Sequence, residues 1–492
     1  MKKKLAKLLG YDPVAKQTNF RTEIIAGLVT FLAMAYILTL NPTIIAFDGG
    51  YPALWSSLFI ATALGAIIGT LLMAFLAKMP LAQASGMDLH SLIAGMIGGS
   101  AAMQYGTQFT IGQAFMMILI SGLVFLLLSV IRIKGKTFRE LVFDGMPVSV
   151  KSAISVGIGL FIAYIGFQNA GVIVSGVTIS DLVKFTQWDT AKYAVLAFIG
   201  LFVITILDKL NVKGAVIIGI VVATIVGIPF GITDLSILAG NGDVSWKFWE
   251  NFGNFFSVGE NSVFGSFTSV FTEGFPSGSI FTVIMLIITM CMIDMFNTMG
   301  TIVGCCSSSN VLSDADGKPR NYGKIMLSDA IATCSGAMLG TSTVTTFVES
   351  GAGVSAGGRT GLTALTTAIL FALALFAMPL FAVIPSAAIA SALIYVGVLM
   401  MKDNVKNVDF SNAVKATSAF LTIVVMVLSY SIINGIGIGL LSYVIMSALA
   451  YLLGLIKYAI KKDEKPVWDV SVVAIIIFLL FCAYFFIPKT LF

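Results

Sequence analysis

The feature that most constrains this chain is the repetition of long apolar blocks along its length. The blocks run for about 17 to 25 residues, which an α-helix needs to cross roughly 30 Å of hydrocarbon. Hydrophobic residues make up 58% and charged residues 11% of the 492 residues, a composition typical of membrane proteins. Continuous apolar runs such as 472–486 exclude a β-barrel, whose strands alternate over about ten residues. An all-α polytopic membrane protein is predicted.

Hydropathy and charge together predict the number and orientation of the spans. The predicted spans are approximately 22–47, 52–77, 84–99, 110–131, 148–174, 191–208, 214–236, 280–303, 325–340, 345–357, 361–383, 385–401, 414–431 and 433–456. Whether 468–488 also spans stays open. With a cytoplasmic N-terminus, 25 of the 29 Lys and Arg residues fall on cytoplasmic ends, as the positive-inside rule requires. This asymmetry favours the inner (plasma) membrane, and it explains the net charge of +5 by contact with the lipid bilayer, without nucleic acid.

A more hydrophilic segment at mid-chain divides the spans into seven before and seven after it. Because seven is odd, the second half enters the membrane from the opposite side, which predicts an inverted repeat. The predicted parts are a cytoplasmic N-terminus (1–21), a first seven-span repeat (22–236), an extracellular connection (237–279), a second seven-span repeat (280–456), and a basic segment with the C-terminal apolar stretch (457–492).

Two Gly/Ser/Thr-rich runs interrupt the predicted spans, at 83–91 and 340–358. The first spans of the two halves begin about 258 residues apart, and this offset carries 84–90 onto 342–348. Such runs suit extended backbone, which is tolerated at membrane depth where protein covers it or where it lines a cavity. We expect two short extended segments before half-helices, in spans 3 and 10. The alternative is that both are ordinary loops.

Ionisable side chains inside the predicted spans mark candidate functional positions. Near mid-bilayer each costs at least about 2.5 to 3.5 kcal/mol on insertion scales, so those present usually serve a pathway or a pair. Four stand out: Asp88, His90, Asp294 and Glu349. Asp329 is a fifth ionisable residue, at the start of the ninth span and nearer its cytoplasmic end. A role in helix capping or in a gate is supported there at least as well as a role in a pathway or a pair.

Asp294 lies about halfway along the eighth span, in the run MCMIDMFNTMGT. Helical spacing places Asn297 and Thr301 on the same side as this carboxylate. A carboxylate flanked by amide and hydroxyl groups can accept a hydrogen bond from a substrate N–H. The alternative is a buried Asp that ties two helices together.

Glu349 is followed by the small residues Ser350 and Gly351. Small side chains there would let a ligand approach backbone N–H groups at the start of a half-helix. We therefore predict substrate binding by Asp294, Glu349, Ser350 and Gly351, and proton coupling by the two carboxylates. A buried carboxylate can carry a proton when desolvation brings its titration towards neutral pH.

His90 is the only histidine in the chain. A lone histidine is more often a packing group than a ligand, and neither a second histidine nor a paired cysteine supports a metal site. Its place within one residue of the repeat-equivalent of Glu349 favours substrate contact or proton handling. Asp88 can then set its tautomer or charge.

The sequence lacks the motifs of the common enzyme classes. A Walker A loop, an HExxH motif and a plausible Ser-His-Asp set are absent, so the prediction is a transporter with no cofactor and no metal, driven by an ion gradient.

Four segments carry a family resemblance: NFRTEIIAGLVTFLAMAYILTLNPTII (19–45), SVGIGLFIAYIGFQNAGVI (155–173), MFNTMGTIVG (295–304) and GTSTVTTFVESGAGVSAGGRTGLTAL (340–365). They closely resemble the AzgA-like hypoxanthine/adenine/guanine permeases of the nucleobase:cation symporter family. The resemblance runs over nearly the whole chain. It implies a core domain (spans 1–4 and 8–11) that moves against a gate domain (spans 5–7 and 12–14), proton symport and a homodimer. It also implies that Asp294 and Glu349 are the purine-binding carboxylates of spans 8 and 10.

The third-span motif departs from the family pattern. The family usually has A-P-G-M-G-L-N, with the Asn in purine binding, whereas this chain has Ser85 for Pro, Asp88 for Gly and His90 for Asn. Asn297 stands where the family commonly has a second Asp. The site thus exchanges an amide for an imidazole and moves one carboxylate, which predicts altered selectivity, for example towards xanthine or urate.

Three functions remain open. The favoured one is proton-coupled uptake of a purine nucleobase or a similar small heterocycle by an elevator-like alternating-access mechanism. The second is transport of an anion on the same fold, against which the two carboxylates argue because they repel an anion. The third is a channel or receptor, against which the clustering of polar residues at one locus argues.

Overall fold

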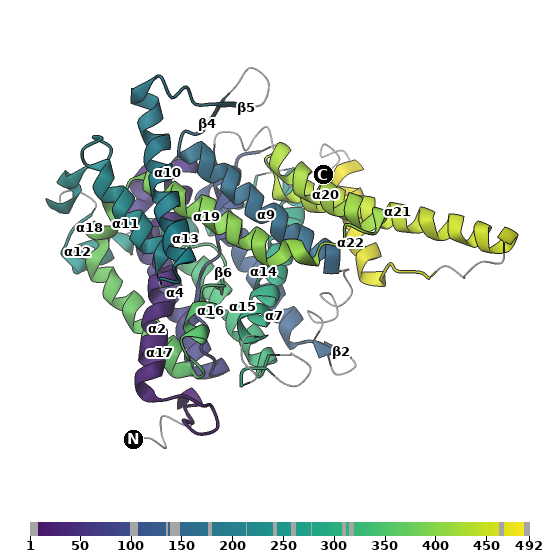
Figure 1. Ribbon diagram of the computed structural model, residues 1–492, viewed down its shortest axis with the longest axis horizontal. Helices are drawn as coiled ribbons and strands as arrows, with labels where there is room; N and C mark the ends of the chain where they lie inside the picture. Colours follow the sequence, from purple (N-terminus) through teal and green to yellow (C-terminus); the bar gives the residue numbers. More distant parts are fainter. Residues whose placement is uncertain are drawn as a thin grey trace.

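The structure, a computed structural model, describes residues 8–98, 107–133, 136–137, 148–175, 180–212, 214–239, 244–256, 262–276, 278–307, 311–313, 319–461 and 467–486. Helices dominate the described chain (Figure 1). The helices are α2 (Phe20–Met34), α3 (Ile37–Thr43), α4 (Trp55–Leu72), α5 (Met87–Ile97), α7 (Ile111–Val130), α9 (Val148–Asn169), α10 (Trp188–Lys209), α11 (Ala215–Gly227), α12 (Phe248–Phe255), α13 (Val263–Glu273), α14 (Ile280–Ser307), α15 (Tyr322–Leu339), α16 (Ser350–Ser355), α17 (Gly361–Ala374), α18 (Met378–Ala382), α19 (Ser386–Asn404), α20 (Ala413–Leu428), α21 (Ile432–Lys461) and α22 (Val472–Phe486). The prediction of an all-α polytopic membrane protein is confirmed.

The helices follow the predicted spans closely. Within the described residues, nine helices are long and apolar enough to cross a membrane, and four shorter apolar helices accompany them. The first candidate span runs over Phe20–Phe47 and contains both α2 and α3. At the open C-terminal stretch, α22 has 15 residues, fewer than the roughly 20 that a perpendicular span needs.

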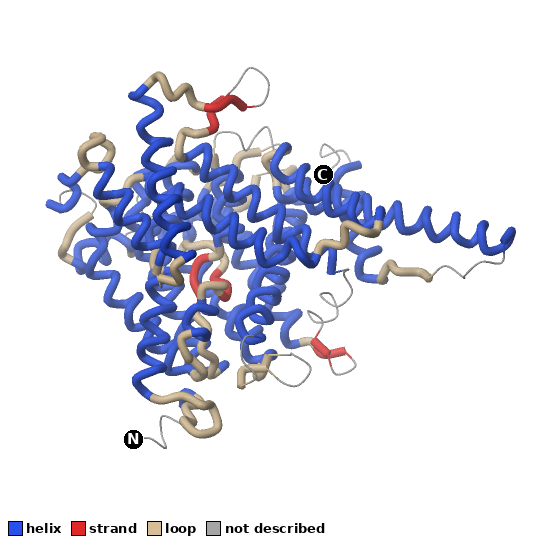
Figure 2. Tube along the Cα trace, in the orientation of Figure 1, coloured by secondary structure: helices blue, strands red, loops and turns tan. Residues whose placement is uncertain are grey.

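Two short strands meet near the centre of the helical assembly, which confirms the extended segments predicted in spans 3 and 10 (Figure 2). Strand β1 (Gln83–Ser85) pairs antiparallel with β6 (Val344–Thr346), so that Ala84 lies opposite Thr345. Each strand is followed within a few residues by a short helix, α5 after β1 and α16 after β6. The pairing satisfies backbone groups that lipid cannot satisfy.

Two other strand pairs lie in connections between helices. They are β2 (Arg132–Ile133) with β3 (Lys136–Thr137), and β4 (Ile173–Ser175) with β5 (Ser180–Leu182).

The helices form two groups by their packing. In the first, α2, α4, α7, α15, α16 and α17 pack against one another around β1 and β6, α14 joins them through α7 and α16, and α5 joins them through α7 and α14. In the second, α9, α10, α11, α19, α20 and α21 pack together. Few contacts join the groups, among them those of α9 with α5 and α14. In Figure 1, the far half of α21 projects from the body and α22 returns towards it.

The hydrophilic connection at 237–279 contains two helices that the hydropathy pattern did not predict. Helix α13 packs against α7 and α15, and α12 packs against α4. Val263 is fully buried, and its backbone N–H donates to Ser57 Oγ over 3.0 Å. The described part of the connection is thus a folded cover over the first helix group.

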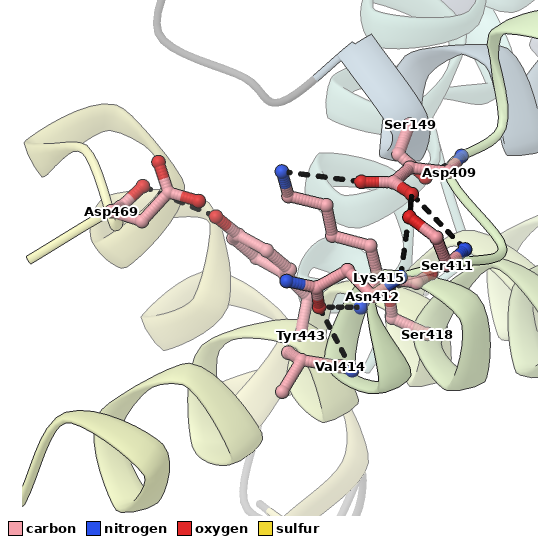
Figure 3. A network of polar contacts seen from close by, with 9 residues as sticks. All are labelled: Ser149, Asp409, Ser411, Asn412, Val414, Lys415, Ser418, Tyr443 and Asp469. Atoms are coloured by element: carbon pink, nitrogen blue, oxygen red, sulfur yellow. Dashed lines mark hydrogen bonds and ion pairs between the residues drawn. The ribbon is translucent and has the colours of Figure 1, made fainter. Parts of the chain in front are cut away.

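A polar network joins the start of α9 to the loop before α20 (Figure 3). The backbone N–H of Asp409 donates to Ser149 Oγ over 3.2 Å, and the Asp409 carboxylate accepts from the Ser411 hydroxyl over 2.6 Å. The Ser411 hydrogen bond is the first cause that holds the pKa of Asp409 below its usual range. Asn412 then caps α20 by accepting from two backbone N–H groups. The network fixes the second helix group at one end.

Candidate substrate site

The paired strands form the scaffold on which the predicted site residues lie. Pairing continues beyond the strands, because Phe347 N donates to Ala82 O over 3.1 Å and Gly86 N donates to Thr343 O over 2.7 Å. Strand β6 begins 261 residues after β1, close to the offset of about 258 expected from the sequence. Because the pairing is antiparallel, it joins segments from opposite halves of the chain, and the residues that follow each strand lie beside those that precede the other.

Glu349 lies directly before α16 and is held by the first span. The Tyr36 hydroxyl donates to Glu349 Oε1 over 2.5 Å. Tyr36 lies between α2 and α3, where its backbone keeps helical φ and ψ angles. The other carboxylate oxygen, Oε2, is buried and has no hydrogen-bond partner among the described residues. A buried acceptor in this state calls for a donor from a ligand or water.

Asp294 is buried in α14 and is joined to β6 through α15. The Thr333 hydroxyl lies 3.5 Å from Asp294 Oδ2 and 3.2 Å from the carbonyl oxygen of Val344. Asp294 and Glu349 therefore both connect to the strand pair, one beside β6 and one just after it. Asn297 follows Asp294 by three residues on the same helix, as predicted, and its side chain is half-buried.

Asp329 is fully buried in α15, where it links three elements. Its Oδ1 accepts from Gln83 Nε2 over 3.1 Å and from Thr298 Oγ1 over 3.3 Å. Gln83 Nε2 also reaches Thr346 Oγ1 at 3.3 Å. The carboxylate thus holds β1 against α14 and α15. It lies inside the helical assembly, whereas its sequence position suggested a role at the cytoplasmic end of the span.

His90 is fully buried in the first half of α5 and is bonded to the strand before it. Its Nε2 lies 3.2 Å from Ser85 Oγ. Its Nδ1 is buried and has no partner among the described residues. The sequence offset predicts equivalent positions for His90 and Glu349. Glu349 immediately precedes α16, whereas His90 is the fourth residue of α5, so His90 lies about one turn further into its helix than Glu349 does.

The remaining predicted residues have different surroundings. Ser350 is fully buried, and its hydroxyl accepts from the Ala82 N–H over 3.0 Å, so it serves the strand pair. The N–H of Ser350 donates to Phe347 O over 3.1 Å, and that of Gly351 donates to Val348 O over 2.9 Å. The expectation that these N–H groups are available to a ligand is therefore wrong, because the tight turn uses them.

Asp88 lies in α5, and its side chain lies outside the described residues.

Sequence reasoning missed two features of the site. One is Tyr36, which looked like an ordinary aromatic residue in an apolar run. The other is the hydrogen bond between Ser85 and His90, two of the three replaced residues of the third-span motif. Their joint departure from the family pattern was a signal that they interact.

Comparison with known protein families matches residues 21–438 to the permease family. The chain belongs to this family. The permease is a multi-pass membrane transporter and not an enzyme. It is 34% identical to the guanine/hypoxanthine permease PbuO of Bacillus subtilis (strain 168), over 88% of its own length and 93% of that protein. It is 35% identical to the adenine permease AdeP of Escherichia coli (strain K12), over 87% of each chain. The predicted family resemblance is confirmed.

Solved structures similar to the permease support the same fold. The transmembrane domain of the cyanobacterial bicarbonate transporter BicA matches with a TM-score of 0.57 at 17% identity, covering 85% of the permease and 97% of that domain. SLC26A9 matches with a TM-score of 0.54 at 12% identity, covering 92% of the permease and 69% of that chain. At these identities the likeness concerns the fold alone.

Proposed function

We propose that this permease takes up purine nucleobases by proton symport. The observation that carries the proposal is Glu349, whose Oε1 is fixed by Tyr36 and whose Oε2 is a buried acceptor without a partner among the described residues. A purine offers ring N–H and amino donors that match such an acceptor. Relatives at 34% and 35% identity are named guanine/hypoxanthine and adenine permeases, which supports this substrate class.

Proton coupling is assigned to Glu349 and Asp294. Asp294 lies in the candidate span Ile280–Met299, and Glu349 lies in the predicted tenth span. A charged carboxylate is costly at membrane depth, so each has reason to exchange a proton during the transport cycle. One proton moving down 100 mV supplies about 2.3 kcal/mol, enough for roughly fortyfold accumulation. In this cycle the substrate and proton bind together from outside and leave together to the cytoplasm.

The transport movement is assigned to the two helix groups. The first group holds the strand pair with Glu349, Asp294 and His90, and it corresponds to the expected core domain. The second corresponds to the gate domain. Sliding of the core along the gate in an elevator-like motion exposes the site to each side in turn, and few contacts between the groups oppose it. A seven-plus-seven inverted repeat, a cytoplasmic N-terminus in the inner membrane and a homodimer complete the proposal.

Selectivity differs from the usual hypoxanthine/adenine/guanine set in this proposal. His90 and Asp88 stand where the family motif has Asn and Gly, and Asn297 stands for an Asp. Xanthine and urate, which carry additional N–H and carbonyl groups, are therefore tested beside the common purines.

The alternative is another small heterocycle or an anion. The matched anion transporters have the same fold, but two carboxylates beside the strand pair disfavour an anionic substrate.

Two measurements test the function. The first is thermal stability of purified permease with purines, pyrimidines and small anions, because a ligand that binds only the folded state raises the unfolding temperature. The second is uptake of radiolabelled purines by a purine-uptake-deficient strain, with and without a protonophore. Purine-specific stabilisation and protonophore-sensitive uptake support the proposal. Stabilisation by anions alone overturns it, and unchanged accumulation with protonophore overturns the proton coupling.

A further inference from the structure

Four buried side chains beside the strand pair form a chain of polar contacts that ends on His90. Ser85 Oγ lies 2.7 Å from Ser342 Oγ, 2.9 Å from Thr341 Oγ1 and 3.2 Å from His90 Nε2. All four side chains are 0% exposed, so these contacts are shielded from bulk water. Because each hydroxyl has one proton and two acceptor sites, the contacts restrict where every proton lies.

The proton of Thr341 is assigned first. Asn41 Nδ2 can only donate, and it donates to Thr341 Oγ1 over 2.9 Å. The remaining contact of Thr341 Oγ1 is with Ser85 Oγ. Thr341 therefore donates its proton to Ser85, which uses one of the two acceptor sites of Ser85.

The proton of Ser342 decides the tautomer of His90. Ser342 Oγ lies 3.3 Å from the Gly86 carbonyl oxygen, which can only accept. When Ser342 donates to Gly86, Ser85 donates to Ser342, and His90 Nε2 must donate to Ser85. Every contact is then a hydrogen bond. The reverse arrangement, in which Ser342 donates to Ser85 and Ser85 to His90, leaves the Gly86 contact without a proton.

We propose that His90 is a neutral imidazole with its proton on Nε2, and that its Nδ1 accepts a hydrogen bond from an N–H group of the bound heterocycle. Nδ1 is buried and has no partner among the described residues. A protonated imidazole would instead place a charged N–H donor at this position, and an unpaired buried charge is far more costly than an unpaired acceptor. Ser85 and Ser342 are positioning residues that hold the tautomer.

The assignment narrows the ligand class, and this part rests on the proposed function. His90 Nδ1 and Glu349 Oε2 are both buried acceptors without partners among the described residues. A ligand that reaches both offers at least two N–H donors, a requirement that guanine, xanthine, hypoxanthine and adenine meet and that a base with a single N–H does not. A base in which one of these N–H groups is methylated leaves an acceptor unpaired, which costs affinity about tenfold.

The tautomer can be measured directly because the chain has a single histidine. Protein labelled with ¹⁵N-histidine and purified through a tag without histidine gives one pair of ring nitrogen resonances. We expect Nδ1 at the position of an unprotonated ring nitrogen and Nε2 at that of a protonated one. The opposite assignment, or two protonated nitrogens, overturns the proposal.

A substitution at Ser342 should reverse the tautomer. In Ser342→Ala, the Ser85 proton loses its acceptor and is donated to His90 Nε2, so the two nitrogen resonances exchange positions. The matched control is Ser391→Ala on α19, whose buried hydroxyl bonds the Ala388 carbonyl over 2.6 Å. It should leave the spectrum unchanged. An unchanged spectrum in folded Ser342→Ala overturns the role of the hydroxyl chain. If that variant does not fold, Ser85→Ala replaces it. We then expect a mixture of both tautomers, and a spectrum identical to that of wild type contradicts the role.

A competition assay tests the contact with ligand. Purines methylated at single ring nitrogens are compared with their parent bases for binding to wild type and to His90→Ala. We expect one methylated position to be rejected about tenfold by wild type and less than about threefold by the variant. Equal rejection by both proteins overturns the ligand contact. If wild type binds no purine at all, the proposed function fails, while the nitrogen spectrum still decides the tautomer.

Discussion

The Tyr36 hydroxyl donates a 2.5 Å hydrogen bond to Oε1 of Glu349, and this contact joins the first span to the residue that follows β6. Tyr36 lies in a break between α2 and α3, and Glu349 lies between β6 and α16. Both lie between regular elements rather than within them. The hydrogen bond fixes one carboxylate oxygen, while the other, Oε2, is buried without a partner among the described residues.

Removing the Tyr36 hydroxyl should weaken substrate binding. In Tyr36→Phe the Glu349 carboxylate loses a donor, and a hydrogen bond to a charged group contributes about 1.5 to 3 kcal/mol. We expect the KM for purine uptake to rise about tenfold. Tyr443→Phe is the matched control, because it removes another buried hydroxyl, bonded to Asp469 O over 3.1 Å, on α21. Equal KM values in the two variants would contradict the positioning role.

Glu349→Gln should abolish proton-driven accumulation. Glutamine keeps the size of the side chain, but it replaces one acceptor oxygen by an NH₂ donor and cannot take up and release a proton. The measurement is accumulation of labelled purine against its gradient in energised vesicles, with the unfolding temperature as the check on folding. Accumulation at the wild-type level in this variant would remove Glu349 from the coupling mechanism.

The two extended segments and the tertiary contacts differ in how far the sequence predicts them. The Gly/Ser/Thr-rich runs at 83–91 and 340–358 are local signals, because small polar residues favour extended backbone at membrane depth. The partner of Tyr36 is a different matter, since 313 residues separate it from Glu349. Sequence spacing relates residues on one helix, whereas that contact depends on how two distant spans cross. The Ser85 contacts with Thr341 and Ser342 are equally long-range, and only the pairing of β1 with β6 creates them.

The length of the half-helix after β6 also depended on tertiary structure. The sequence indicated N–H groups open to a ligand at Ser350 and Gly351. In the structure, α16 has six residues, and its first N–H groups donate to carbonyls three residues earlier. Helix α16 packs against α2 and α14, and local composition does not specify these contacts.

His90→Asn should move selectivity towards the common purines. An amide presents both a donor and an acceptor, whereas a neutral imidazole with Nε2 protonated presents only an acceptor at Nδ1. We expect competition by adenine to strengthen relative to competition by xanthine, by about tenfold. The readout is the ratio of inhibition constants in one uptake assay, which a general loss of stability does not change. An unaltered ratio would assign His90 to packing.

Two glycines of α16 should respond differently to the same substitution. A Cβ at Gly353 would overlap Thr30 Oγ1 and come within 2.9 Å of Ala26 O, so Gly353→Ala forces α16 away from α2. We expect a loss of about 1 to 3 kcal/mol in folding free energy. At Gly351 the nearest atom to a new Cβ is Cys305 Sγ at 3.7 Å, an ordinary contact, so Gly351→Ala should keep its unfolding temperature. Similar losses in both variants would contradict this packing.

Glu23→Gln should destabilise the permease although Glu23 lies away from the strand pair. Glu23 is fully buried at the start of α2, where Oε1 accepts from Arg359 N over 3.0 Å. Oε2 accepts from Thr360 N over 3.3 Å, and from Thr363 N and Oγ1 over 3.2 and 2.6 Å. All of these donors lie at the N-terminus of α17, where a negative charge is favourable.

An amide in place of this carboxylate would turn an NH₂ group towards donors and remove the charge. We expect Glu23→Gln to lower the folding free energy by about 2 to 4 kcal/mol, measured as a lower unfolding temperature in one detergent. The control is Glu250→Gln, which removes an exposed carboxylate paired with Lys247 and should have little effect. Because the buried contact joins spans within the first helix group and touches no predicted substrate residue, the KM of the protein that remains folded should be unchanged. A raised KM with unaltered stability would instead place Glu23 on the substrate pathway.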